Sequence, residues 1–110
     1  MAYDATLTAR IRHIVAGHPA IVEKKMFGGL SFILQGNMAC GVHGTDLIIR
    51  LAPSDMDAAL AKPGARPFDL TGRPMKGWLM VAGDACTDDA VLQTWVEQSV
   101  TFAQSLPAKG

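Results

Sequence analysis

Cys40, His43 and Asp46 are the residues of this chain whose types and spacing come closest to a reactive group. A cysteine beside a histidine acts as a nucleophile–base pair when the two side chains lie within hydrogen-bonding reach. The apolar run that carries Cys40 and His43 predicts one β-strand, in which residues an odd number apart face opposite sides of the sheet. This parity argues against a dyad, so we predict no catalytic residue and no enzymatic activity.

Metal and cofactor sites are not indicated either. The same parity weakens a zinc site, which needs four soft or carboxylate ligands. His13 and His18 lie on or just after a predicted helix, with no evident carboxylate partner. Cys40 and Cys86 lack CxxC spacing, which in a reducing compartment is typical of buried, small apolar side chains. Gly29 precedes an apolar run where a phosphate loop would have Lys followed by Ser or Thr. We predict no metal and no cofactor.

Composition limits the classes of protein further. The chain has 110 residues, so we expect a single domain spanning residues 1–110. Its formal net charge is zero, whereas dedicated nucleic-acid binders usually carry a strong positive excess. No N-terminal signal pattern and no apolar run of membrane-spanning length are evident, so we expect a cytoplasmic protein.

The hydrophobic pattern predicts helices at both ends of the chain and a strand meander between them. Apolar spacing and cap residues indicate helices at residues 4–16, 54–62 and 87–106, with Trp95 in the core. Short apolar runs indicate strands at residues 22–26, 30–34, 38–43, 47–51 and 78–81, with a short extended piece at 67–70.

Turn chemistry connects these predicted strands. Residues 35–37 and 44–46 contain Gly with Asn or Asp and are typical of hairpin loops. Gly28 and Gly29 predict a bulge or a sharp bend between the first two strands. Strands joined by hairpins and flanked by helices indicate an α+β fold with an antiparallel sheet, not a parallel βαβ sheet.

One segment of the chain carries a family pattern. Residues 24–29 read KKMFGG, Phe32, Gly36 and Met38 follow, and residues 47–51 read LIIRL. This pattern resembles the TfoX N-terminal domain, over roughly residues 26–81. The resemblance implies the helix-on-meander fold that this domain shares with type III secretion chaperones. It also implies a non-catalytic, stand-alone regulatory domain, linked to bacterial competence and acting through the transcription machinery or another regulator.

Arg50 is the most distinctive residue of this pattern, because a charge interrupts an otherwise apolar strand. Such an arginine either extends from an edge or pairs inside a cleft. The family-like pattern also has a basic residue before its Met-Phe-Gly-Gly unit. This chain has Lys25 there, which would weaken a site that depends on bidentate arginine contacts.

We predict that a protein partner meets either an exposed sheet edge or the bend at Phe27, with Arg50 and Arg73 as polar anchors. The hypothetical binding residues are Lys25, Phe27, Gly28, Gly29, Arg50 and Arg73. The chaperone-like fold also implies a homodimer. The alternative is weak or indirect nucleic-acid binding by a local basic patch of Lys24, Lys25, Arg66, Arg73 and Lys76. If these five residues do not lie on one face, their charges are simply solvated and each contributes little.

Overall fold

The computed structural model describes residues 3–26, 29–68 and 77–107. The elements follow the order α1 (Ala5–Val15), β1 (Ile21–Met26), β2 (Gly29–Leu34), β3 (Asn37–His43), β4 (Asp46–Arg50), η1 (Pro53–Asp55), α2 (Met56–Leu60), β5 (Ala65–Pro67), β6 (Trp78–Val81), η2 (Gly83–Cys86) and α3 (Asp89–Ser105). The predicted α+β class, with an antiparallel sheet between terminal helices, is confirmed.

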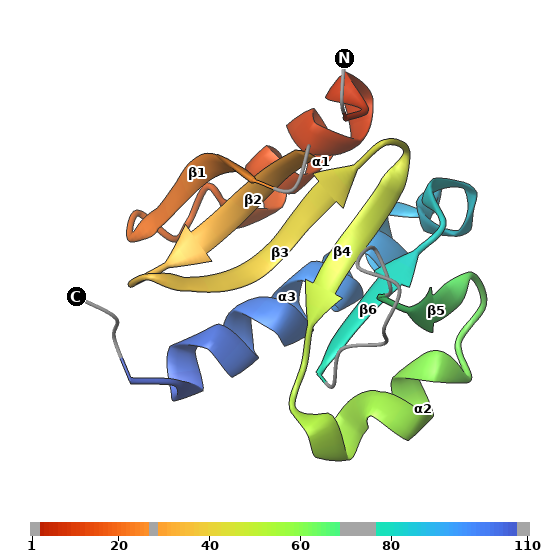
Figure 1. The fold of residues 1–110 in the computed structure, drawn as a ribbon. Helices are drawn as coiled ribbons and strands as arrows, with labels where there is room; N and C mark the ends of the chain where they lie inside the picture. The colour runs from red at the N-terminus through yellow and green to blue at the C-terminus, as the bar shows by residue number, and fades with distance from the viewer. Residues whose placement is uncertain (1–2, 27–28, 69–76, 108–110) are drawn as a thin grey trace.

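The strands form one antiparallel sheet in the order β1-β2-β3-β4-β6-β5. The first four strands are sequential neighbours, as expected for a meander, and β6 then pairs with β4 while β5 lies outside β6. Figure 1 shows α1 and α3 on the same face of the sheet, with α2 near the end formed by β5 and β6. The sheet therefore has two edge strands, β1 and β5.

The main core lies between the sheet and its two helices. Phe32 of β2, Leu47 and Ile49 of β4 and Trp95 of α3 are all buried in one cluster. Because side chains alternate along β4, Leu47 and Ile49 face the helices, while Ile48 faces the opposite side of the sheet. Trp95 was predicted to be a core residue, and its exposed fraction of 2% confirms it.

A second, smaller cluster occupies the opposite face of the sheet. It contains Met38, Ile48, Phe68 and Met80, with Trp78 packed against them. The rings of Phe68 and Trp78 lie 5.9 Å apart, centroid to centroid. Met38 and Met80, both buried, therefore fill a core on this face of the sheet.

Acidic caps begin both long helices. The Asp4 carboxylate accepts hydrogen bonds from the backbone N–H groups of Thr6 and Leu7, and Asp88 accepts one from Ala90. These bonds satisfy donors that have no partner inside the helix. The cap predicted for the short middle helix is wrong, because the chain enters α2 through the 3₁₀ turn η1 and no side chain caps it.

Three further boundaries differ from those predicted. The extended piece expected at 67–70 is strand β5, which instead covers Ala65–Pro67 and pairs with β6; residues 69 and 70 lie outside the described part. Asn37 and Asp46, expected in loops, each begin a strand. The turn between β2 and β3 is formed by Gln35 and Gly36, which both have positive φ. None of the described helices is long and apolar enough to cross a membrane.

Candidate functional site

The predicted binding residues fall in three places. Lys25 is exposed on β1, Gly29 is buried at the start of β2, and Arg50 ends β4. Phe27, Gly28 and Arg73 lie outside the described residues. Lys25 and Gly29 belong to one hairpin, but β4 is three strands away from β1, which corresponds to about 14 Å across the sheet. The described candidates therefore do not form one compact site.

Gly29 has a structural reason to be glycine. A Cβ atom at this position would collide with the backbone carbonyl oxygen of Val42 in β3. The residue also pairs with Met26 at the closed end of the β1–β2 hairpin. A close approach of two backbones in a sheet is a common reason for glycine in a strand. Gly29 thus allows the start of β2 to lie close against β3.

Arg50 is held by aromatic rings. Its guanidinium carbon lies 5.2 Å from the ring centroid of Trp78 and 5.6 Å from that of Phe102. Trp78 is its register partner in β6, and Phe102 comes from α3. Such cation–π contacts explain how a charge is tolerated at the end of an apolar strand. They tie the sheet to α3, so Arg50 has a stabilising role whether or not a partner also contacts it.

The sulfur and imidazole groups do not combine into a reactive site. Cys40 is fully buried opposite Ile49, and burial raises the pKa of its thiol to about 12, despite a hydrogen bond with Ser99 that acts in the other direction. In the strand register, His43 lies opposite Asp46 at the end of the β3–β4 hairpin. Because only the thiolate is an effective nucleophile, Cys40 is inert at neutral pH.

The remaining potential ligands are equally dispersed. Asp46 is occupied by an ion pair with Arg66, 2.6 Å between Oδ2 and Nη2. Burial also raises the pKa of the Cys86 thiol, which nearby Arg10 opposes and Asp84 reinforces. Across residues 3–26, 29–68 and 77–107, no three His, Cys, Asp or Glu side chains are placed to hold a metal ion.

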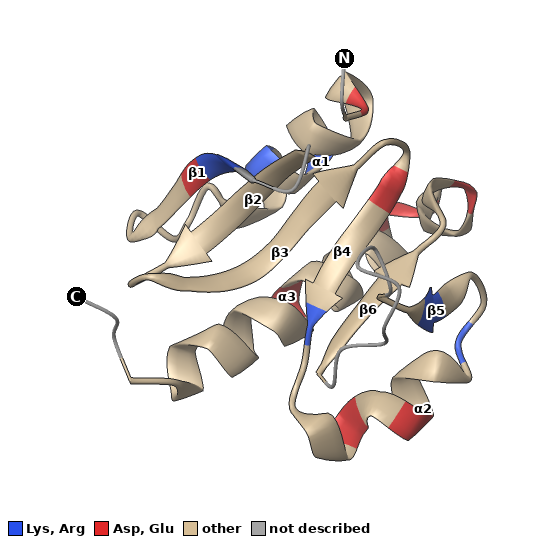
Figure 2. Cartoon of the chain, viewed as in Figure 1, with Lys and Arg blue, Asp and Glu red and all other residues tan. Residues whose placement is uncertain are grey.

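The basic residues of the alternative prediction also lie apart. Lys24 and Lys25 are on β1, and Arg66 is on β5 at the far edge of the sheet. Arg73 and Lys76 are not among the described residues. In Figure 2 the basic segment of β1 is separated from that of β5 by the width of the sheet. The described part of the set does not make one continuous patch.

The β1 edge, defined as the outer side of strand Ile21–Met26, is the most accessible part of the sheet. Val22, Glu23, Lys24 and Lys25 are all exposed. Val22 is 58% exposed, more than any other large apolar side chain in the described part of the chain. A six-residue edge strand presents free backbone groups to solvent and is a template for pairing with another strand.

One side chain of this edge is tied to α1. The Arg12 guanidinium donates two hydrogen bonds of 2.7 Å to the Glu23 carboxylate. These bonds hold the pKa of Glu23 below its ordinary value, although partial burial opposes the shift. The same contact raises the pKa of Arg12. Glu23 therefore faces the helices and stays ionised, and the β1 edge is held against α1 in a fixed orientation.

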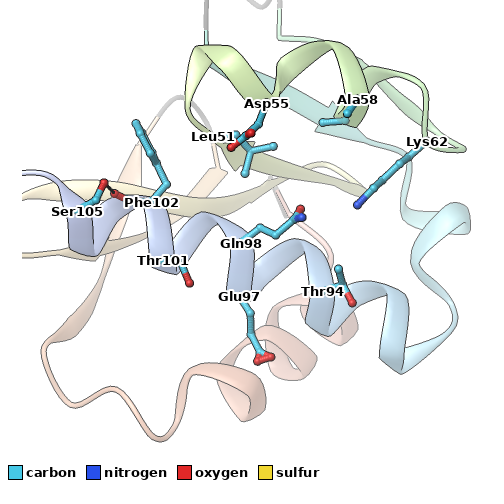
Figure 3. Close-up of a pocket in the computed structure, with 11 residues that line it drawn as sticks. Leu51, Asp55, Ala58, Lys62, Thr94, Glu97, Gln98, Thr101, Phe102 and Ser105 are labelled. Atoms are coloured by element: carbon cyan, nitrogen blue, oxygen red, sulfur yellow. Dashed lines mark hydrogen bonds between the residues drawn. The ribbon is translucent and has the colours of Figure 1, made fainter.

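A groove between α2 and α3 was not found by sequence reasoning. Its volume is about 660 Å³, and its floor and walls include Leu51, Ala59 and Phe102. Figure 3 shows the Lys62 ammonium and the Gln98 amide directed toward one another across it. The polar residues of α3 that line the groove recur at helical spacing: Thr94, Glu97, Gln98, Thr101 and Ser105. That spacing was the available signal.

The groove contains no evident catalytic pair. Lys62 lies over the Trp95 ring, 4.6 Å from Nζ to the centroid, so its ammonium is fixed by a cation–π contact. Asp55 and Glu97 add two carboxylates to the lining, and Gln93 donates a hydrogen bond to Glu97. The groove resembles a binding surface of mixed charge more than a reaction site.

Comparison with known proteins gives a single positive finding. The sequence profile of the TfoX N-terminal domain matches residues 13–103, which is most of the chain. The match extends beyond residues 26–81, where the sequence resemblance was expected to lie, and it includes most of α3 but only the last turn of α1. No curated protein and no solved structure matches the chain.

Proposed function

The chain belongs to the TfoX N-terminal domain family, and we propose that it is a non-catalytic protein-interaction module that regulates by binding another protein. The regulated process, by analogy with the family, is bacterial competence. The partner is another regulator or a component of the transcription machinery, in the cytoplasm. Nucleic acid is contacted weakly or only through that partner.

The accessible β1 edge is the observation that carries this proposal. Edge strands are a well-known docking element, because main-chain hydrogen bonds supply affinity and neighbouring side chains supply specificity. Here four consecutive residues of the strand, 22–25, are exposed. The opposite edge offers much less, because β5 has three residues and ends with Pro67. A partner strand therefore has one suitable place to add.

The described chemical groups support binding in preference to catalysis. Cys40 is buried with a raised pKa, and His43 has no nucleophile beside it. A catalytic site normally brings a nucleophile and a base within hydrogen-bonding reach. Arg10, Arg12 and Arg66 instead form ion pairs, and Arg50 and Lys62 lie over aromatic rings.

The test is site-specific photocrosslinking in the living host cell. A photoreactive amino acid placed at Val22 is expected to capture a discrete partner protein, identified by mass spectrometry. The matched control is the same substitution at Val91, an exposed apolar residue of α3 that is 40% accessible. If the two positions give the same products, or if neither gives any, the β1 edge is not a docking site.

The link to competence is tested separately. Deleting the gene is expected to change the frequency of natural transformation, and complementation with the intact gene is expected to restore it. Complementation with a variant altered at Val22 and Lys24 is expected to fail while the protein remains folded. An unchanged transformation frequency in the deletion strain removes competence from the proposal but leaves the interaction module.

We also propose that the protein forms a homodimer, as chaperone-like folds commonly do. The basic β1 edge is poorly suited to contact its own copy, so a dimer is expected to use another surface. Multi-angle light scattering across a concentration series measures the mass directly. A monomer at the highest concentration contradicts the dimer without affecting the interaction module.

A further inference from the structure

We propose that the β1 edge binds an extended, acidic segment of a partner protein as an additional antiparallel strand. The inference rests on the proposed function and specifies the chemistry of the partner. It starts from the backbone: β1 pairs with β2 along its whole length, from Ile21 opposite Leu34 to Met26 opposite Gly29. No described strand pairs with its other side.

Charge indicates what kind of strand fits. Most described Lys and Arg side chains already have a partner: Arg10 with Asp89, Arg12 with Glu23, Arg66 with Asp46, Arg50 with Trp78 and Phe102, and Lys62 with Trp95. Lys24 and Lys25 have neither a carboxylate nor an aromatic partner among the described residues. The unsatisfied positive charge of the described chain is thus concentrated on its most accessible edge.

The two lysines lie on opposite faces of the sheet. Glu23 faces α1, since it pairs with Arg12, and strand alternation places Lys25 on that same face. Lys24 and Val22 consequently lie on the other face, where their register partners are Ser31 and Ile33. Side chains of β1 can therefore contact an added strand on both faces of the sheet.

The order of these side chains predicts a sequence motif. In an antiparallel strand, read from its N-terminus, successive residues lie opposite Lys25, Lys24, Glu23 and Val22. The first two are expected to be Asp or Glu. The third is unrestricted, because Glu23 is already paired with Arg12. The fourth is expected to be apolar, to cover Val22. The motif is acid, acid, any residue, apolar residue.

A second copy of this chain does not fit the same edge. Pairing β1 with β1 would bring two unpaired lysines from each copy together, and like charges opposed across strands are destabilising. The chain's own consecutive acids, Asp88 and Asp89, begin α3, and Asp88 caps it. They are therefore not available as a strand. The charge pattern favours a different, acidic protein.

The test uses a fluorescein-labelled peptide of about nine residues, close to the upper range of natural strands, with the motif Glu-Glu-Thr-Val at its centre. Fluorescence anisotropy is expected to show saturable binding to the full chain. The double variant Lys24→Gln/Lys25→Gln is expected to bind about tenfold more weakly, since each exposed charge pair contributes modestly. A peptide with Lys-Lys in place of Glu-Glu is expected not to bind.

Two matched controls separate the edge from the rest of the surface. Val22→Thr retains strand propensity but removes apolar contact, and is expected to weaken binding by a few-fold. Val91→Thr makes the same change on α3 and is expected to leave binding unchanged. An effect of Val91→Thr equal to that of Val22→Thr would overturn the assignment.

Backbone N-methylation tests strand addition itself. Methyl groups on alternate peptide amides that face β1 are expected to abolish binding, because each removes a ladder hydrogen bond. Methyl groups on the other amides are expected to be tolerated. Tolerance of both patterns, together with equal competition by duplex DNA, would show a nonspecific anion-binding surface and overturn the inference.

The outcome is separable from that of the proposed function. If no acidic peptide binds, or if binding persists in Lys24→Gln/Lys25→Gln, the acidic-strand assignment is wrong. Partner capture by the photoreactive residue at Val22 would still support the interaction module in that case. Loss of that capture removes the proposed function itself.

Discussion

The two edges of the sheet differ in how they meet solvent. At β5 the strand is only three residues long, its last residue is Pro67, and Arg66 is held by Asp46. At β1 the strand is six residues long, and Lys24 and Lys25 have no partner among the described residues. Proline and shortness block an edge against any strand, whereas charge blocks it only against strands of like charge.

Of the two edges of the described sheet, β1 is therefore the selective one. β5 is closed by geometry, since Pro67 has no N–H to donate to a neighbour. β1 is protected only by the positive charge of Lys24 and Lys25. This charge repels a second copy of β1 but attracts an acidic strand. The sheet centre, where Cys40 and Phe32 are buried, offers no access to either kind of partner.

Thiol alkylation is expected to show the largest contrast, between the edge and the centre. A cysteine at the exposed position of Val22, in Val22→Cys, should react at the rate of a free thiol. Cys40, with a pKa of about 12, should react on the order of a thousandfold more slowly at pH 8, because so little thiolate is present. Mass spectrometry of iodoacetamide-treated native protein measures both rates. Comparable labelling of Cys40 and the introduced cysteine would contradict the buried position.

Gly29→Ala should give the next largest effect, because it disturbs the attachment of β1. The added Cβ collides with the Val42 carbonyl oxygen, so the β1–β2 hairpin must shift. We expect the free energy of unfolding to fall by about 2–4 kcal/mol, measured by urea denaturation. Gly17→Ala is the control, since nothing lies within 4 Å of its added Cβ. Equal stability of the two variants would show that β3 does not constrain the hairpin.

Asp46→Asn tests whether charge alone selects a strand. The substitution frees Arg66 and makes the β5 edge cationic, as β1 already is. Because this ion pair is partly exposed, stability should fall by only about 0.5 kcal/mol. The number of acidic peptides bound per chain, measured by isothermal titration calorimetry, should stay unchanged, because β5 remains short and ends in Pro67. A second bound peptide would show that length and proline matter less than charge.

The contact that orients β1 should give the smallest effect, and one that depends on pH. The pKa of Glu23 is lowered by Arg12, so its contribution to stability is present above the ordinary glutamate pKa of about 4.3. The contribution is lost as pH falls through the lower pKa of the folded state. Arg12→Gln should therefore be slightly less stable than the parent at neutral pH. Thermal unfolding at several pH values should show the two curves converging in acid.

The sequence predicted most of the fold because its signals are local. Hairpin glycines and apolar runs indicated β2, β3, β4 and β6, and acidic caps indicated α1 and α3. β5 was misplaced because Ala65 and Arg66 directly follow Pro63 and Gly64 and were assigned to a loop, while the pairing of β5 with β6 depends on residues far along the chain. Propensity does not capture such tertiary pairing.

The candidate site was predicted less well, for a related reason. Arg50 was identified from the interruption of an apolar run, but its stacking on Phe102 joins segments 52 positions apart in the sequence (102 − 50). Nothing in the local pattern reveals that contact. The β1 edge did leave a local signal: residues 22–25, Val-Glu-Lys-Lys, lack the apolar–polar alternation of a strand with one buried face. For the α2–α3 groove the only local signal was the helical spacing of its α3 residues, because the groove itself forms where the two helices pack.

The strand order also has a consequence for how the chain folds. β1 to β4 are joined by short hairpins, whereas β6 must find β4 across α2 and β5. Hairpins close small loops and form quickly, while distant pairings lose more chain entropy before any contact forms. We expect the hairpins to be structured in the folding transition state and the β4–β6 pairing to follow. In stopped-flow measurements, Val42→Ala should then slow refolding, whereas Leu79→Ala should mainly accelerate unfolding.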